Sequence, residues 1–194
     1  SGQRFDATER PDGSFAVAYG AFSAPPKFAI IDADGAQLLA PTEFHTVAAE
    51  RIAVASLSNG NVLLAFADSG NANHGTFVIY SDSGALVAGP TVFSASTIAG
   101  LDADGLAGGG AAIAFNRAVG GYQLYYAVYD NDGAVVKNQT LFDANEYNYS
   151  IDVEALGGGG FVVSGSAYTT ADYTGRYGVY SADGTEVLAA TELD

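Results

Sequence analysis

The chain has 194 residues, of which 48% are apolar and 12% aromatic, so it is long and apolar enough to form a folded core. Its formal net charge of −15 argues against binding to a nucleic-acid backbone or to an anionic membrane surface. The absence of cysteine excludes disulfides, thiol catalysis and cysteine-ligated metal sites, and two histidines are too few for an ordinary histidine zinc site. No apolar run approaches the roughly 18 residues of a membrane-spanning helix, so we expect no membrane insertion.

Four short strands are predicted in the first quarter of the chain. In 15–19 (FAVAY), Phe15, Val17 and Tyr19 alternate with smaller residues, which is the period-two pattern of a strand. The Ala-Asp-Gly sequence that ends at Gly35 predicts a tight hairpin, in which glycine supplies the positive φ. The predicted strand segments are 4–10, 11–19, 27–35 and 36–44.

The same order of strands and turns returns three more times along the chain. The glycine of the hairpin recurs as Gly84, Gly133 and Gly184, so that successive copies are offset by 49, 49 and 51 residues. A fixed period in this range indicates a repeat architecture. The further strand segments are 51–57, 58–66, 76–84 and 85–93, then 100–106, 108–116, 125–133 and 134–142, then 150–156, 157–165, 176–184 and 185–193.

Four copies of a four-stranded antiparallel unit predict an all-β fold, a four-bladed β-propeller closed into a single domain over residues 1–194. The blades are expected at about 1–46, 47–95, 96–144 and 145–194. A β-sandwich is the main alternative and an open β-solenoid a second. The equal length of the copies favours the propeller, because a sandwich does not require it.

One element of the repeat is similar to sequences in a known class of proteins. It reads Tyr-Asp-Asn-Asp-Gly at 129–133, with variants at 80–84 and 180–184 and a departure at 31–35. This resembles repeats of large, acidic, cysteine-free bacterial secreted proteins of the RTX and adhesin type. The resemblance implies a secreted or cell-surface location and an interaction role, and it names no ligand. With no methionine in it, the chain is expected to be a monomeric segment cut from a longer protein.

The first strand of each copy carries a carboxylate at a matching position. Asp6, Asp102 and Asp152 align there, and the second copy has Ala53 instead. If these strands line the axis of a propeller, the three carboxylates face a narrow channel and could bind Ca²⁺, which takes 6–8 oxygen ligands. Alternatively, each carboxylate accepts hydrogen bonds from backbone N–H groups nearby and braces the blades.

Three Asp-rich segments, 32–35, 102–105 and 130–133, superficially suggest calcium-binding EF-hands. An EF-hand needs a loop of 12 residues that ends in a bidentate glutamate, and none of these segments has one. We therefore interpret them as hairpin turns.

The connections that vary most between copies point to a binding face. In a propeller, the loops 20–27, 67–75, 116–123 and 165–176 share one face with the links 44–50 and 142–150, and variable loops on a rigid scaffold are where binding sites usually lie. Tyrosine beside amide and charged groups suits a glycan, a peptide or a protein ligand. Alternatively, the tyrosines only cover the edges of the blades. The predicted ligand-binding residues are Tyr147, Asn148, Tyr149, Tyr168, Asp172, Tyr173 and Arg176, with Asn145 beside them.

Catalysis has little support in the sequence. His45 and His74 lie in loops without a recognisable nucleophile motif, and the glycine runs 108–110 and 157–160 lack the lysine and helix of a phosphate-binding loop. We therefore expect a non-enzymatic ligand-binding or adhesion module of a larger secreted protein. One alternative is a purely structural spacer or a fibre or surface-layer domain. Another is a hydrolase with an unrecognised carboxylate pair among the 22 acidic residues.

Overall fold

The computed structural model describes residues 5–21, 23–118, 121–143, 146–168 and 172–193, and for 146–149 only the backbone. Within these residues the chain forms fifteen β-strands and one 3-10 turn, η1 (Ser69–Asn71). Neighbouring strands of the described residues pair antiparallel, so the prediction of an all-β fold is confirmed. No helix in the described part of the chain is long and apolar enough to cross a membrane.

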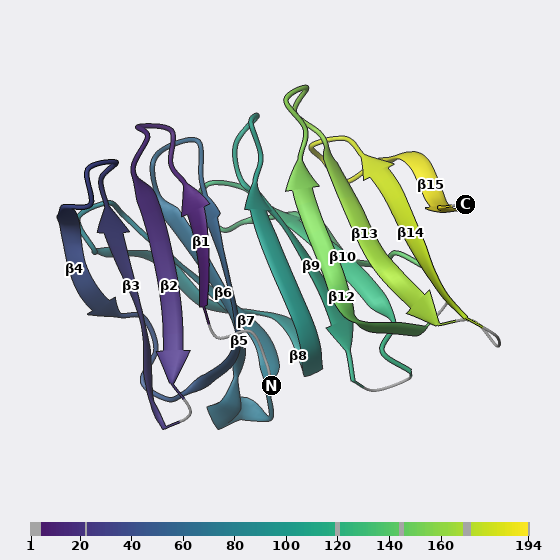
Figure 1. Ribbon diagram of the computed structural model, residues 1–194, viewed down its shortest axis with the longest axis horizontal. Helices are drawn as coiled ribbons and strands as arrows, with labels where there is room; N and C mark the ends of the chain where they lie inside the picture. Colours follow the sequence, from purple (N-terminus) through teal and green to yellow (C-terminus); the bar gives the residue numbers. More distant parts are fainter. Residues whose placement is uncertain (1–4, 22, 119–120, 144–145, 169–171, 194) are drawn as a thin grey trace.

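The strands form three sheets that follow the order of the chain (Figure 1). Within each sheet, neighbouring strands are consecutive in the chain, as expected for short connections. The first sheet contains β1 (Phe5–Glu9), β2 (Phe15–Ala21), β3 (Ala24–Ile31) and β4 (Gln37–Glu43). The second contains β5 (Ala49–Ser56), β6 (Val62–Asp68), β7 (His74–Tyr80), β8 (Leu86–Gly105), β9 (Ala111–Arg117), β10 (Leu124–Tyr129) and β11 (Val135–Leu141). The third contains β12 (Glu146–Ala155), β13 (Phe161–Tyr168), β14 (Tyr173–Tyr180) and β15 (Glu186–Glu192).

The seven-stranded sheet arises because β8 serves two of the repeats. Its first part, from Leu86 to Thr97, pairs with β7, and its second part, from Ile98 to Gly105, pairs with β9. The sequence analysis places separate strands at 85–93 and 100–106. They merge because the link between them contains Ser, Ala, Thr and Ile and no proline or glycine before Gly100 that would end an extended segment. We call the resulting groups the first unit (β1–β4), the second unit (β5–β7 with 86–97), the third unit (98–105 with β9–β11) and the fourth unit (β12–β15).

Tight turns join the third and fourth strands of every unit. The turn glycines Gly35, Gly84, Gly133 and Gly184 have φ between 74° and 87°, where a residue with a Cβ would be strained. In the first of these turns the carboxylate of Asp32 accepts hydrogen bonds from the backbone N–H groups of Asp34 and Ala36, at 3.0 and 2.7 Å. The segments 32–35 and 130–133 are thus hairpin turns, whereas 102–105, which the sequence analysis also interprets as a turn, lies within β8.

Three hydrophobic clusters lie between consecutive units. On β6, Val62, Leu64 and Phe66 belong to the cluster shared with the first unit. The alternate residues Leu63, Ala65 and Ala67 belong to the cluster shared with the third unit. The third cluster joins the third and fourth units around Tyr126, Phe161 and Tyr180. Both faces of the middle sheets are therefore buried, which explains their nearly continuous apolar strands.

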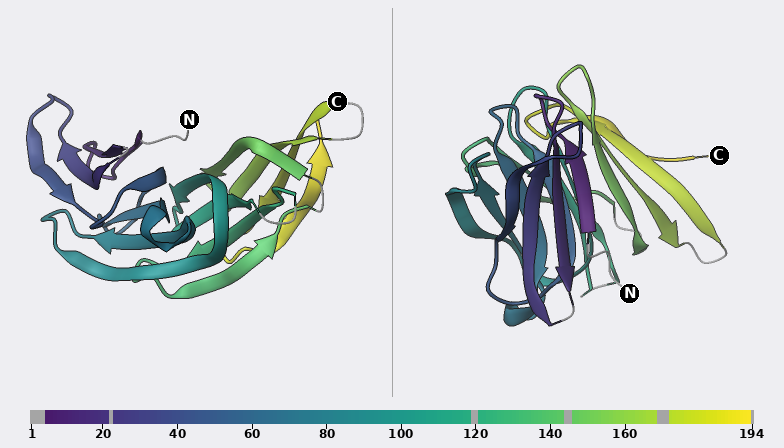
Figure 2. Two further views of the ribbon diagram at one scale, coloured as in Figure 1. Left: turned by 90° about the horizontal axis from the view of Figure 1, so that it is seen from below. Right: turned by 60° about the vertical axis from the view of Figure 1, so that its left-hand side comes forward.

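The four units form an open arc rather than a ring. The first and last sheets lie at opposite ends of the long axis, and the view from below shows a crescent that is open on one side (Figures 1 and 2). The sequence prediction of a ring closed by four units is therefore not met in this structure. The repeats in the sequence give the number of units, but the angle between neighbouring units depends on the size of the side chains at each interface. Here aromatic residues such as Phe28, Phe77 and Tyr126 fill these interfaces.

The inner strands of the second and third units approach closely at Gly105, and this contact provides a test of the packing. A Cβ on Gly105 would lie 1.7 Å from the backbone oxygen of Ser56, so alanine there would force the two inner strands apart. We expect Gly105→Ala to destabilise the protein by about 1–3 kcal/mol, the usual cost of overpacking. Gly157→Ala is the matched control, because a Cβ there meets nothing within 4 Å. Urea unfolding curves should separate the two variants, and equal midpoints would contradict the described packing.

Candidate functional site

The loops and the links between units meet at one end of the molecule, at the bottom of Figure 1. The Ser69 hydroxyl donates a hydrogen bond to the backbone oxygen of Ala48, which joins the η1 loop to the link after the first unit. His45 Nε2 lies 2.9 Å from Asp68 Oδ1 at the same place. Farther along, the Thr97 hydroxyl donates to the oxygen of Ala72 at 2.9 Å. We call this end of the molecule the long-loop end.

Two exposed tyrosines lie side by side where the fourth unit reaches the long-loop end. Tyr168 ends β13, Tyr173 begins β14, and the two residues are paired partners across the hairpin. Their ring centroids are 5.2 Å apart with an angle of 58° between the planes, and the residues are 47% and 59% exposed. The carboxylate of Asp172 accepts a hydrogen bond from the Tyr173 backbone N–H at 2.8 Å. These two rings form an exposed aromatic surface of the kind that ligands contact.

Arg176 is predicted from the sequence to belong to the same site, but its side chain contacts other parts of the fold. Its Nε lies 2.9 Å from Asp143 Oδ2, and its Nη2 donates to the oxygen of Ala190 at 3.1 Å. Since Arg176 is three residues after Tyr173 on one strand, the two side chains lie on opposite faces of the sheet. The guanidinium thus joins the end of the third unit to the fourth and does not lie beside the tyrosine pair.

The remaining predicted binding residues are on or next to β12. The backbone of Tyr147 pairs with Ala167, next to Tyr168, and an irregularity in the register follows it before Ile151. The side chains of Tyr147, Asn148 and Tyr149 lie outside the described residues, as does all of residue 145.

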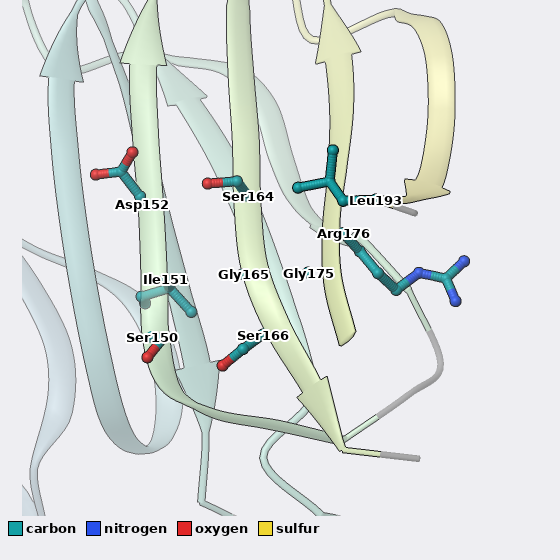
Figure 3. Close-up of a pocket in the computed structure, with 9 residues that line it drawn as sticks. All are labelled: Ser150, Ile151, Asp152, Ser164, Gly165, Ser166, Gly175, Arg176 and Leu193. Carbon is teal, nitrogen blue, oxygen red and sulfur yellow. The ribbon is translucent and has the colours of Figure 1, made fainter. Parts of the chain in front are cut away.

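A shallow pocket of about 280 Å³ lies on the fourth unit, and the sequence analysis did not find it. Figure 3 shows its floor, in which Ser164, Gly165 and Ser166 of β13 lie between β12 and Gly175 of β14, while Arg176 points away. A comparison of the copies could have shown this feature. At the position of Ser164 the other units have alanine, namely Ala18, Ala65 and Ala114, which are fully buried.

The aligned aspartates of the inner strands brace neighbouring units. Asp6 Oδ2 accepts a hydrogen bond from the backbone N–H of Val54 at 2.8 Å, which links the first unit to the second. Asp102 Oδ2 accepts from Val153 N–H at 2.8 Å and links the third unit to the fourth. Asp104 adds the same contact to Ala155 N–H at 2.8 Å. The bracing role that the sequence analysis considered is thus present for Asp6 and Asp102.

The carboxylates of this group also repel one another. Asp6, Asp102, Asp104, Asp152 and Glu154 line a small polar pocket of about 180 Å³ between the inner strands. The pKa of Asp102 is raised to about 7, chiefly by burial; the hydrogen bond from Val153 lowers this pKa, and the charges of Asp152 and Asp6 raise it. Burial also raises the pKa of Asp6 and that of Glu154.

Calcium binding by Asp6, Asp102 and Asp152 stays a prediction. Among the residues that the structure describes, no group of three or more Asp, Glu or His side chains is arranged to hold a metal ion. The carboxylates in this pocket repel one another, and a bound proton, a bound cation or the loss of one charge would each reduce that repulsion.

The raised pKa of Asp102 predicts how stability depends on pH. Because the folded-state pKa of about 7 exceeds the ordinary 3.8, the stability that protonation contributes is fully present below pH 3.8 and is lost as the pH rises through 7. Asp102→Asn keeps an acceptor oxygen for Val153 and removes the charge. We expect equal Tm values for the variant and the parent at pH 4, and a Tm higher by roughly 2–4 °C for the variant at pH 8, as for about 1 kcal/mol in a protein of this size. Parallel Tm profiles across this range would contradict the account.

The calcium prediction has its own test in thermal melts at pH 8. We expect Ca²⁺ to raise the Tm of the parent protein, excess chelator to reverse the rise, and the double variant Asp102→Asn/Asp152→Asn to show a smaller rise, because two charged ligands are lost. Titration calorimetry without heat, together with an unchanged Tm, would remove calcium from this site.

Comparisons with known proteins inform the fold and leave the family open. No family model matches the sequence, and no curated protein matches it. Among solved structures, a quinonprotein alcohol dehydrogenase-like protein from Bacteroides thetaiotaomicron VPI-5482 aligns with a TM-score of 0.54 at 14% identity, over 96% of this chain and 45% of that one. A GH43 endo-arabinanase from Bacillus licheniformis aligns with a TM-score of 0.49 at 12% identity, over 99% of this chain and 79% of that one. A protein of unknown function from Dyadobacter fermentans DSM 18053 aligns with a TM-score of 0.44 at 9% identity, over 99% and 82%.

The chain thus spans less than half the length of the first of these structures. At such low identity, the likeness concerns the fold alone. The fold of this chain is accordingly all-β and propeller-like.

Proposed function

We propose that the chain is a non-enzymatic ligand-binding module whose four units are blades of a β-propeller. Its binding surface is the tyrosine pair at the long-loop end of the fourth unit. The ligand is a glycan, a peptide or a protein. The rigid sheets hold the site, and the loops supply its variable part, as in other scaffolds with functional loops.

The observation that carries this proposal is the exposed contact between Tyr168 and Tyr173. Large aromatic residues are usually buried, yet these two are 47% and 59% exposed and hold one another in place at 5.2 Å. Two rings fixed by a hairpin lose little conformational entropy when a ligand packs on them, and their hydroxyl groups remain free to bond it.

The charge of the chain supports the same class of ligand. With a net charge of −15, the surface repels polyanions, whereas neutral sugars and peptides experience no such repulsion. A secreted or cell-surface protein that contacts glycans or other proteins is consistent with an acidic, cysteine-free composition.

The carboxylates support a non-enzymatic role. A hydrolase of the glycosidase type needs two carboxylates that face a substrate from a defined separation. Asp6, Asp102 and Asp104 instead accept backbone hydrogen bonds from the next unit. Asp102, whose pKa is raised, thus accepts a hydrogen bond that joins the third unit to the fourth.

Binding to an immobilised panel of glycans and peptides tests the proposal. We expect Tyr168→Ala and Tyr173→Ala each to weaken binding about tenfold, the usual effect of removing an aromatic anchor. The phenylalanine variants should bind nearly as well if ring packing dominates. Val135→Ala, at an exposed position on β11, is the control and should change nothing. If the parent protein binds no member of the panel, or if the alanine variants bind as the parent does with unchanged melting curves, the chain is better explained as a structural spacer.

A further inference from the structure

The interfaces between the units repeat the same contacts at matching positions. In the second, third and fourth units, the turn glycine packs against a residue of the unit before it. That residue lies four positions after the turn glycine of its own unit. A Cβ on Gly84 would lie 3.0 Å from Leu39, one on Gly133 would lie 3.4 Å from Ala88, and one on Gly184 would lie 2.9 Å from Lys137. Each unit therefore has a forward face, turned to the next unit, and a backward face, turned to the previous one.

Among the described residues, none lies against the backward face of the first unit in this way. A Cβ on Gly35 would meet nothing within 4 Å, unlike its three counterparts. Phe5, Phe15 and Tyr19 on this face are 70%, 41% and 39% exposed. Their counterparts on the second unit, Ile52, Val62 and Phe66, are 1%, 0% and 0% exposed.

The forward face of the fourth unit likewise lacks a neighbouring unit within the part of the chain that the structure describes. Leu156 is 37% exposed, whereas its counterparts Leu57 and Leu106 are 0% and 1% exposed. Leu188, the counterpart of Leu39, is 39% exposed, and Leu193 is 58% exposed. In the first three units the position of Leu193 is held by buried phenylalanines: Phe44, Phe93 and Phe142.

The pocket of Figure 3 lies on this forward face, at the place where an isoleucine of the next unit packs in two of the interfaces inside the chain. Between the first and second units, Ile52 fits against Gly20, whose Cβ would lie 3.0 Å from Ile52 Cδ1. Between the third and fourth, Ile151 fits against Gly100 at 3.2 Å. On the fourth unit, Ser166 corresponds to Gly20 and Ser150 to Gly100, and both line the pocket. The residue that corresponds to Ile52 and Ile151 on the first unit is Phe5.

We propose that the forward face of the fourth unit binds the backward face of the first unit of a second copy of this chain. Phe5 of one copy enters the pocket beside Ser150 and Ser166 of the other, and Leu188 packs against Gly35. Because the arc bends toward one side, two copies related by a two-fold axis make this contact twice and close a ring of eight units (Figure 2). This proposal replaces the expectation from the sequence, which was a monomeric segment of a longer protein.

The choice of a second copy follows from continuity with the three interfaces inside the chain. The two free faces belong to the same chain and carry the matching halves of a contact that the fold already makes three times. The serines in the pocket, in place of the alanine and glycine of the first unit, let this face meet water before association. Separable interfaces are typically more polar than a permanent core in this way.

Light scattering coupled to size exclusion tests the proposal on the 194-residue protein. We expect a mass of twice 19.8 kDa that falls to the monomer on dilution. Phe5→Asp and Leu188→Asp should each weaken the dimer about tenfold or more, because both are exposed anchors at the centre of the contact. Val135→Asp, 52% exposed on the third unit, is the matched control and should stay dimeric. Circular dichroism of each variant is the control for correct folding.

A crosslink defines the register of the contact. The chain has no cysteine of its own, so single variants report only the intended pair. A mixture of Phe5→Cys and Ser166→Cys should form a covalent dimer on oxidation, whereas either variant alone and Val135→Cys should not. A monomer at every concentration would overturn the proposal and assign the faces to further units of a longer polypeptide. Assemblies larger than two copies would overturn the closed ring. Tyr168 lies two residues beyond Ser166 and therefore on the same face of the sheet. Mass and crosslinking are measured without ligand, so neither result depends on whether the tyrosine pair binds one.

Discussion

Packing of one sheet against the next is the interaction on which the rest of this structure depends. A four-stranded sheet has two faces, and here the strands of the middle units are apolar on both, as in Val62 to Ala67 of β6. Such a sheet cannot bury both faces by itself, so it requires a neighbour on each side. The backbone N–H groups of Val54 and Val153 donate hydrogen bonds to aspartates of the preceding unit, which holds the inner strands in register.

This requirement also explains which sheet faces stay exposed. The middle units are packed on both sides, so the sheet faces that remain exposed are those of the two end units. The loops of the fourth unit present the tyrosine pair, and its forward face presents the pocket in Figure 3. The carboxylates have a different role, because Asp6, Asp102 and Asp104 accept backbone hydrogen bonds between the units. We expect the raised pKa of Asp102 to make the contact between the inner strands depend on pH.

Local features of the fold could be predicted from the sequence, and geometry between units could not. Strand alternation and the turn glycines depend on neighbouring residues, so the strands and the positive φ at Gly35 follow from the sequence. The merging of two strands into β8 and the opening of the ring depend on side-chain packing across interfaces. Likewise, the alignment of Asp6 with Asp102 was visible, but the backbone partners of these residues were not. Arg176 was assigned to the binding surface by its place in the chain, although alternation puts it on the opposite face from Tyr173.

The central claim is that four sheet units stack into an open arc with two unpaired end faces. Small-angle X-ray scattering of a monomeric Phe5→Asp variant tests it most directly, because an arc and a ring of equal mass differ in their distribution of interatomic distances. The account predicts a profile that fits the crescent of Figure 2, with a longer maximum dimension than a closed four-unit ring. A profile that fits the compact closed ring would contradict it.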